Sequence, residues 1–129
     1  MGQTLSRSEA REIAFRMVFA GGCGDDFLEA ALDGRKACEP EIKFINKICE
    51  TVKQKQAEID EKISAHLKDW TIDRISKTDL AALRTAAAEI IINEVPRAVI
   101  VNECVAVAKK YGDERSGAFV NGVLAKFAG

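Results

Sequence analysis

The sequence has few of the residues from which catalytic and metal sites are usually built. Its 129 residues include one histidine and four cysteines. The cysteines are scattered, with no pair at the two-residue spacing of common zinc ligands: Cys23, Cys38, Cys49 and Cys104. Because a zinc site needs clustered ligands, we expect no metal and no cofactor. Cys49 and Cys104 lie on apolar stripes and are expected to be small core residues.

Long apolar runs are also missing. No stretch approaches the ~20 apolar residues that cross a bilayer, and no signal-peptide pattern is visible at the start. We therefore expect a cytoplasmic protein with reduced thiols. The length, with 47% hydrophobic and 30% charged residues, predicts one globular domain over residues 1–129. A formal net charge of −1 gives no overall attraction to nucleic acid, so any RNA site must be a local patch.

Strand signals are absent, since the chain shows neither sustained alternation of apolar and polar residues nor a hairpin turn between β-branched runs. Apolar residues recur instead at three- and four-residue spacing, which predicts an all-α fold of about seven helices. The helices are expected to begin near Ser6, Asp25, Pro40, Ser76, Pro96 and Ser116, with a join or kink near Gln54 to Ala57.

Local expectations follow from single residues. Ser6 with Glu9, and Ser76 with Asp79, have the spacing of helix N-terminal caps. Gly112 is expected to end a helix in the left-handed conformation, and Ser116 to cap the last helix. Phe27 is expected to point inward from the second helix, Trp70 to fill the core between two halves, and His66 to be a partly buried polar residue.

The first helix carries Arg7, Arg11, Phe15 and Phe19, each four residues from the next. Such residues form one row on a helix. Basic and aromatic side chains in a row could neutralise phosphates and stack unpaired bases. The alternative is a solvated arginine pair beside an aromatic edge of the core.

Two charges interrupt the most apolar helix, whose row of small residues leaves room for another helix to approach closely: Ala81, Ala82, Ala86 and Ala88. Arg84 and Glu89 stand among apolar neighbours there. A desolvated charge without a partner is strongly destabilising. Each is therefore expected either to be paired within the molecule or to lie at a binding surface.

Taken together, residues from the whole chain resemble the NusB family of bacterial transcription antitermination factors. The C-terminal part of the resemblance comprises Pro96, Ile100, Val101, Asn102, Glu103, Ala108, Lys109, Gly112, Phe119, Val120, Asn121, Gly122, Val123 and Leu124. The central part comprises Trp70, Arg74, Asp79, Leu83, Arg84 and Glu89, and the N-terminal part Ala10, Arg11 and Ala14. No single motif among these is specific, but their order and spacing over nearly the whole chain are.

The resemblance implies two small helical bundles packed through a shared core, and a function without catalysis. Family members pair with NusE, which is also small-subunit ribosomal protein ten. The pair recognises boxA, a single-stranded RNA element, and joins the RNA polymerase antitermination complex, chiefly on ribosomal RNA operons. The mechanism implied is coupled binding, in which each ligand raises the affinity for the other.

The resemblance also suggests which residues act. The RNA-binding candidates are Arg7, Arg11, Phe19, Tyr111, Arg115, Phe119 and Asn121, and the NusE-binding candidates are Asp79, Arg84 and Glu103. The family's arginine-rich N-terminal segment is diluted here by Glu9 and Glu12. Fewer phosphate contacts weaken binding, so weak RNA affinity is expected unless NusE is present.

Two alternative interpretations remain open at this point. One is a diverged helical interaction module without its own RNA site, such as a homodimer or a ribosome-assembly adaptor. The other is an enzyme, because RNA cytosine methyltransferases carry a similar helical domain. The sequence shows no glycine-rich cofactor loop, so we expect the chain not to be an enzyme.

Overall fold

The computed structural model describes residues 4–67 and 71–127. It contains α1 (Arg7–Ala20), α2 (Asp25–Leu32), α3 (Glu39–Ala65), η1 (Ile72–Arg74), α4 (Lys77–Ile92), α5 (Arg97–Tyr111) and α6 (Ser116–Ala125). Within these ranges the only extended pairing is an isolated bridge between Thr4 and Lys36. The all-α prediction is therefore confirmed. None of the helices described here combines the length and apolarity of a membrane span.

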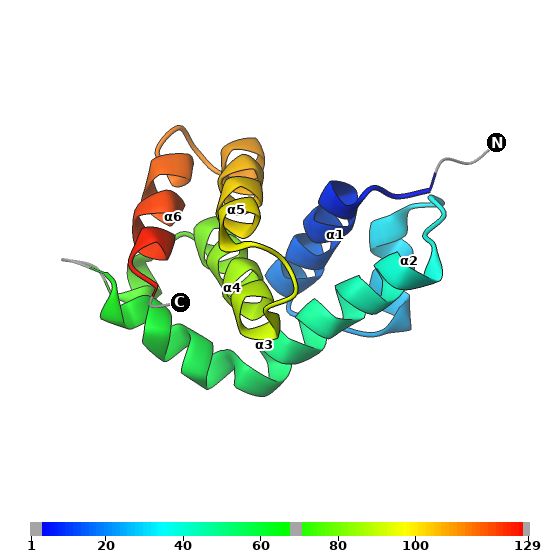
Figure 1. The fold of residues 1–129 in the computed structure, drawn as a ribbon, viewed down its shortest axis with the longest axis horizontal. Coiled ribbons are helices and arrows are strands. Elements are labelled where there is room, and N and C mark those ends of the chain that lie inside the picture. The colour runs from blue at the N-terminus through cyan, green and yellow to red at the C-terminus, as the bar shows by residue number, and fades with distance from the viewer. Residues whose placement is uncertain (1–3, 68–70, 128–129) are drawn as a thin grey trace.

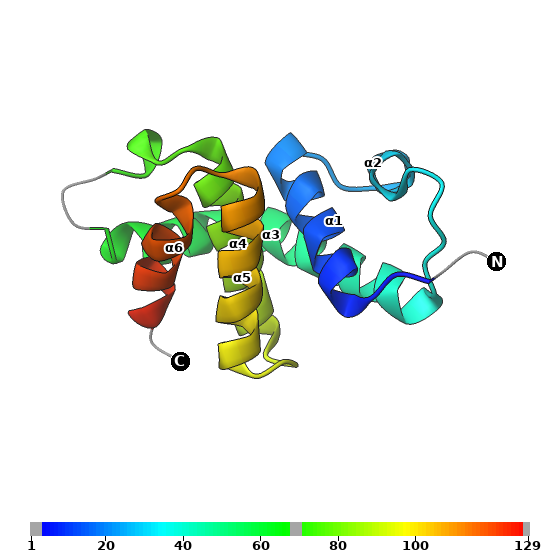
Figure 2. The ribbon, with the colours of Figure 1, turned by 90° about the horizontal axis from the view of Figure 1, so that it is seen from above.

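Helix α3 runs beneath the whole molecule and joins its two halves (Figure 1). Lys55 leaves the helical conformation at φ −116° and ψ 19°, which confirms the kink expected between Gln54 and Ala57. Counting the two arms of α3 separately gives seven helical segments, including the other five α-helices. Helix α3 contacts α1 and α4 (Figures 1 and 2). Its N-terminal arm shares a buried cluster with α2, and its C-terminal arm shares one with α6.

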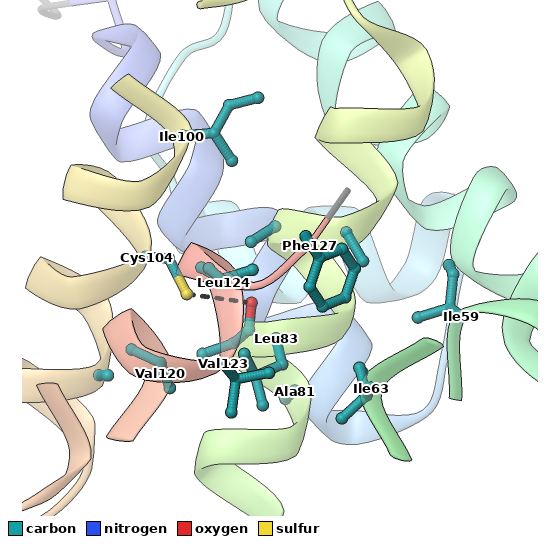
Figure 3. Close-up of a cluster of buried hydrophobic side chains, with 14 of the residues drawn as sticks. Ile59, Ile63, Ala81, Leu83, Ile100, Cys104, Val120, Val123, Leu124 and Phe127 are labelled. Atoms are coloured by element: carbon teal, nitrogen blue, oxygen red, sulfur yellow. Dashed lines mark hydrogen bonds between the residues drawn. The ribbon is translucent and has the colours of Figure 1, made fainter. Parts of the chain in front are cut away.

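The two halves have separate buried clusters. The first joins α1, α2 and the first arm of α3, and contains Ala10, Ile13, Met17, Leu28, Ile45, Ile48 and Val52. The second joins α4, α5, α6 and the second arm of α3, and contains Ile59, Ile63, Leu83, Ile100, Val120, Val123, Leu124 and Phe127 (Figure 3). The kink thus lies where α3 passes from one cluster to the other. This arrangement confirms the predicted pair of packed bundles, but the buried residues form two clusters where one shared core was expected.

Each cluster also receives a side chain from the opposite half. Phe15 of α1 belongs to the second cluster, and Ala88 of α4 belongs to the first. Helix α4 contacts α1, α3, α5 and α6. It can do so because its buried face carries small side chains, including those of Ala82 and Ala88, which let neighbouring helices approach closely. Close helix approach through small residues thereby couples the two halves.

The predicted N-terminal caps at Ser6 and Ser76 are present. At α1, Ser6 Oγ accepts from the Glu9 N–H at 3.0 Å, and Glu9 accepts in return from the Ser6 N–H at 2.8 Å. At α4, Ser76 Oγ accepts from the Asp79 N–H at 3.1 Å. These bonds satisfy backbone donors that the helix itself leaves unpaired. Helix α1 ends at Gly21 in the left-handed conformation, at φ 75°.

The turn between α5 and α6 differs from its prediction. Gly112 is extended, at φ −96° and ψ −157°, so the expected left-handed stop is wrong. A Cβ at this position would lie 2.7 Å from the Ala108 carbonyl oxygen and would also meet Ser116. Glycine is therefore required here by close packing. Ser116 does not cap α6 either, since its Oγ accepts from the Asp113 N–H at 3.1 Å.

Two further expectations concern aromatic residues. Phe27 is 45% exposed, so the prediction that it points inward is wrong. Its ring lies over Gly22, where a Cβ would overlap it, and this contact draws it away from the core. Trp70 lies outside the described residues. His66 is half-buried, as predicted, with its ring centroid 5.4 Å from that of Phe127.

Candidate nucleic-acid and partner interface

Arg7, the first residue of α1, belongs to the candidate RNA surface. Its side chain is 44% exposed, and its Nη2 lies 3.3 Å from Glu41 Oε2 on the first turn of α3. The guanidinium carbon stands 4.2 Å from the centroid of the Phe44 ring. A cation over an aromatic face is held by the quadrupole of the ring. Arg7 is thus positioned by α3, while much of its side chain remains open to solvent.

Arg11 is not part of that surface. Its side chain is 7% exposed, with Nε 2.6 Å from Glu89 Oε1 and Nη1 3.1 Å from Glu103 Oε1. Steps of four residues advance about 40° around a helix, so the predicted row turns away from solvent in its middle. Arg11 and Phe15 face α4 and α5, whereas Arg7 and Phe19 are exposed. The structure therefore leaves Arg11 little access to phosphate, and its role in RNA binding stays a prediction.

The ion cluster around Arg11 ties three helices together. Glu89 comes from α4 and Glu103 from α5, and the Ser8 hydroxyl of α1 donates to Glu103. Burial raises the pKa of Glu89 above its usual range, although Arg11 opposes that shift. A cavity of only about 20 Å³ adjoins the cluster. Glu89 is therefore an internal partner of Arg11, the first of the two roles expected for it.

Phe19 and Tyr111, predicted as separate candidates, lie on one groove. Their rings flank Phe15, with centroid separations of 6.3 Å from Phe19 and 5.1 Å from Tyr111. Phe19 is 51% and Tyr111 38% exposed. The groove encloses about 460 Å³ and is lined also by Arg16, Ala20 and Thr78. Exposed aromatic edges beside an arginine suit a base or an apolar side chain of a partner.

Two lining residues of this aromatic groove were missed as candidates. Arg16 follows Phe15 directly and precedes Phe19 by three residues, so helical spacing could have placed it beside them. Thr78 comes from the start of α4. Nothing local in the sequence connects it with α1, because only the packing of α4 against α1 brings it there.

The remaining RNA candidates do not line the aromatic groove. Arg115 and Asn121 are exposed. Phe119 is half-buried against the second cluster. It lines a different groove of about 270 Å³ together with His66, Leu67 and Lys126. None of the residues that line this groove also lines the aromatic groove, so the structure does not bring Phe119 together with Phe19.

The three partner candidates have different surroundings. Arg84 makes a two-bond contact with Asp60 of α3, at 2.8 and 2.7 Å, which is an internal structural pair. Glu103 is engaged by Arg11 and Ser8. Asp79 has a buried Oδ1 without a hydrogen-bond partner among the described residues, and it follows Thr78 of the aromatic groove.

The buried cysteines are core residues, as predicted. Burial raises the pKa of the Cys104 thiol to about 12, and its Sγ donates to the Ala82 carbonyl at 3.4 Å (Figure 3). Burial likewise raises the pKa of Cys49 to about 12, with a further contribution from Cys23. A thiol with so high a pKa carries little thiolate at neutral pH, so neither is a nucleophile. Among the described residues, no group of three or more side chains has the arrangement of a metal site.

Comparison with known proteins identifies one family. The NusB family profile matches residues 8–129. The transcription antitermination protein NusB of Oceanobacillus iheyensis is 42% identical over 123 residues, covering 95% of this chain and 98% of that protein. Among solved structures, T. maritima NusB superposes with a TM-score of 0.85 at 28% identity, covering 98% of this chain and 92% of that one. A structure of antitermination factors NusB and NusE in complex with double-stranded RNA superposes with a TM-score of 0.82 at 29% identity, covering 94% of each chain.

Proposed function

Because the chain belongs to the NusB family, we propose that it is a transcription antitermination factor that pairs with NusE and binds boxA RNA of ribosomal RNA operon transcripts. Suppression of premature termination would follow from binding alone, without catalysis or a cofactor. The observation that carries this proposal is the similarity over nearly the full length of both chains to proteins named for this activity. Since an antitermination factor acts on nascent transcripts, the proposed site of action is the cytoplasm.

The RNA surface that we propose consists of the exposed members of the predicted set. Arg7 and Arg115 would hold phosphates, Phe19 and Tyr111 would stack bases, and Asn121 would read a base edge. Arg11 would contribute by holding α1 against α4 and α5, since its guanidinium already binds two carboxylates. Phe119 would support α6 from its half-buried position.

For NusE, the proposal retains Asp79, Arg84 and Glu103 with unequal roles. Asp79 is half-buried and directly follows Thr78, which lines the aromatic groove, so a partner bound there would lie near it. Arg84 and Glu103 would act mainly by fixing α4 and α5, because each is already paired inside the molecule. The aromatic groove is also suited to an apolar side chain of NusE, so its ligand must be determined by experiment.

The test is a fluorescence anisotropy titration of boxA RNA with this protein, with and without NusE, at two salt concentrations. We expect salt-sensitive binding that strengthens when NusE is present. Arg7→Ala with Arg115→Ala should weaken RNA binding and flatten its salt dependence, because each single-strand phosphate contact contributes about 0.7 to the log–log slope. Arg74→Ala, which removes another exposed arginine, is the matched control.

The same titration separates the possible ligands of the aromatic groove. Phe19→Ala should lower RNA affinity and leave NusE affinity unchanged if bases stack there. Loss of NusE binding instead would assign the groove to the protein partner. Absence of boxA binding in the presence of NusE would contradict the proposed function. A homodimer that RNA does not dissociate, measured by light scattering, would favour the interaction module without an RNA site.

A further inference from the structure

The basic side chains around α1 are largely neutralised by carboxylates of the same chain. Four basic side chains are paired in this way in the described structure: Arg7 with Glu41 at 3.3 Å, Arg11 with Glu89 at 2.6 Å and Glu103 at 3.1 Å, Arg35 with Glu9 at 4.0 Å, and Lys110 with Glu12 at 2.7 Å. A phosphate that approaches this face therefore meets cations whose charge is already compensated. This feature bears directly on how tightly the proposed surface can hold RNA.

The pair formed by Arg7 differs from the pair formed by Arg11. Arg11 and Glu89 are 7% and 4% exposed, and Arg11 has a second carboxylate partner in Glu103. Solvent and RNA cannot reach such a pair without opening the fold. Arg7 is 44% exposed and makes one contact with Glu41. A guanidinium has five donor hydrogens, so Arg7 keeps donors with which a phosphate can bond.

Glu41 is the fixed member of the exposed pair. Its side chain is 18% exposed, and it stands in the first turn of α3, where the helix dipole favours a carboxylate. Phe44, one turn later on the same helix, contacts Arg7 from its ring face. The carboxylate therefore stays in place whether or not Arg7 remains bound to it.

We propose that Glu41 competes with RNA for Arg7 and thereby sets the affinity of the RNA surface. A phosphate on Arg7 must either displace Glu41 from the guanidinium or share it with that carboxylate at close range. Displacement opposes binding because the Arg7–Glu41 ion pair is lost. Sharing opposes it because the phosphate and the carboxylate, both negative, repel each other near one cation. This inference rests on the proposed RNA-binding function. It adds Glu41, a residue that would change RNA affinity without itself contacting RNA.

The experiment measures boxA RNA affinity by anisotropy for the NusE complex of the wild type and of Glu41→Gln. The glutamine keeps the size of the side chain and removes its charge. We expect affinity to rise about two- to fivefold, the change that corresponds to loss of an exposed ion pair. In an Arg7→Gln background the same substitution should give no gain, because the group for which Glu41 competes is then missing.

Glu58→Gln is the matched control. It removes one negative charge and one exposed ion pair, that with Lys62, from the other arm of α3. Its RNA affinity should stay at the wild-type value. The proposal is overturned by an unchanged affinity of Glu41→Gln, by an equal gain in Glu58→Gln, or by a gain that persists without Arg7.

Failure of the inference can be told apart from failure of the proposed function. If the wild-type protein with NusE binds boxA RNA and Glu41→Gln binds no better, the competition is wrong and the function stands. If neither protein binds boxA RNA at low salt, the proposed function fails and the inference fails with it. NusE affinity, measured separately, should be the same for both proteins.

Discussion

At the scale of single residues, the main finding is that ion pairs join charged side chains of different helices across the interior. Arg84 with Asp60 and Arg11 with Glu89 connect different helices through half-buried or buried contacts. Removing one partner of a buried pair is far more destabilising than removing an exposed one. Arg84 and Glu89 of α4 therefore act as links between helices.

Glu89 should make stability depend on pH. Burial raises its pKa above 4.5 in the folded protein, so the folded state binds the proton more tightly than the unfolded chain. Its stabilising contribution is present below the unfolded pKa and is lost as the pH rises through the folded value. Relative to Glu89→Gln, the wild type should lose free energy of unfolding as the pH rises from about 4.5 towards neutrality.

Urea unfolding of both proteins across that pH range measures this difference. Glu58→Gln removes a carboxylate that is exposed and serves as the charge control. If the difference in free energy of unfolding between wild type and Glu89→Gln stays constant with pH, Arg11 offsets the effect of burial on the Glu89 pKa. If wild type instead gains stability relative to Glu89→Gln as the pH rises, Arg11 outweighs burial. Either result contradicts the prediction.

At the scale of elements, helix ends are determined by close contacts as well as by backbone conformation. Gly112 ends α5 in an extended conformation that any residue can adopt, yet a Cβ there has no room. Gly122 lies within α6, where a Cβ would meet nothing within 4 Å. Packing therefore excludes a side chain at position 112 but leaves space for one at position 122.

Substitution by alanine should separate these two glycines. Gly112→Ala should lower the free energy of unfolding by about 1–3 kcal/mol, because the methyl group must displace the Ala108 carbonyl or Ser116. Gly122→Ala should raise it by about 0.5–1 kcal/mol, since alanine loses less conformational entropy than glycine in a helix. Denaturant midpoints of the two variants measure both effects, and a stable Gly112→Ala protein would disprove the packing argument.

At the scale of the whole molecule, the two halves are separate in their cores but share elements. Helix α3 lines both clusters on either side of its kink, and Phe15 and Ala88 cross between the halves. The aromatic groove is itself formed by this union, with Phe19 from α1 and Tyr111 from α5. The surface proposed for binding therefore depends on how the halves are joined.

Phe15→Ala should destabilise the whole protein while keeping its unfolding cooperative. Truncating a buried phenylalanine costs about 3–5 kcal/mol, and the loss falls on the contact between α1 and the second cluster. We expect one transition, coincident by circular dichroism and by aromatic fluorescence, at a lower denaturant concentration. Phe27→Ala, at an exposed aromatic, should have a much smaller effect, and two separate transitions would contradict the coupling of the halves.

The sequence alone was sufficient for the helices, for the caps at Ser6 and Ser76, and for the kink near Lys55, because short-range spacing and capping chemistry determine these features. The resemblance of residues spread along the chain was likewise sufficient for the family. Neither revealed that Phe27 would fold over Gly22, since that contact depends on the course of a loop.

Tertiary structure decided which of the candidate residues can meet a ligand. Arg7 and Arg11 lie one turn apart in the same predicted row of α1, yet α4 and α5 bury Arg11 and leave Arg7 exposed. Thr78 joins Phe19 and Tyr111 only because α4 packs against α1. Burial and ion pairing depend on neighbours distant in the chain, and helical periodicity carries no information about where those neighbours lie.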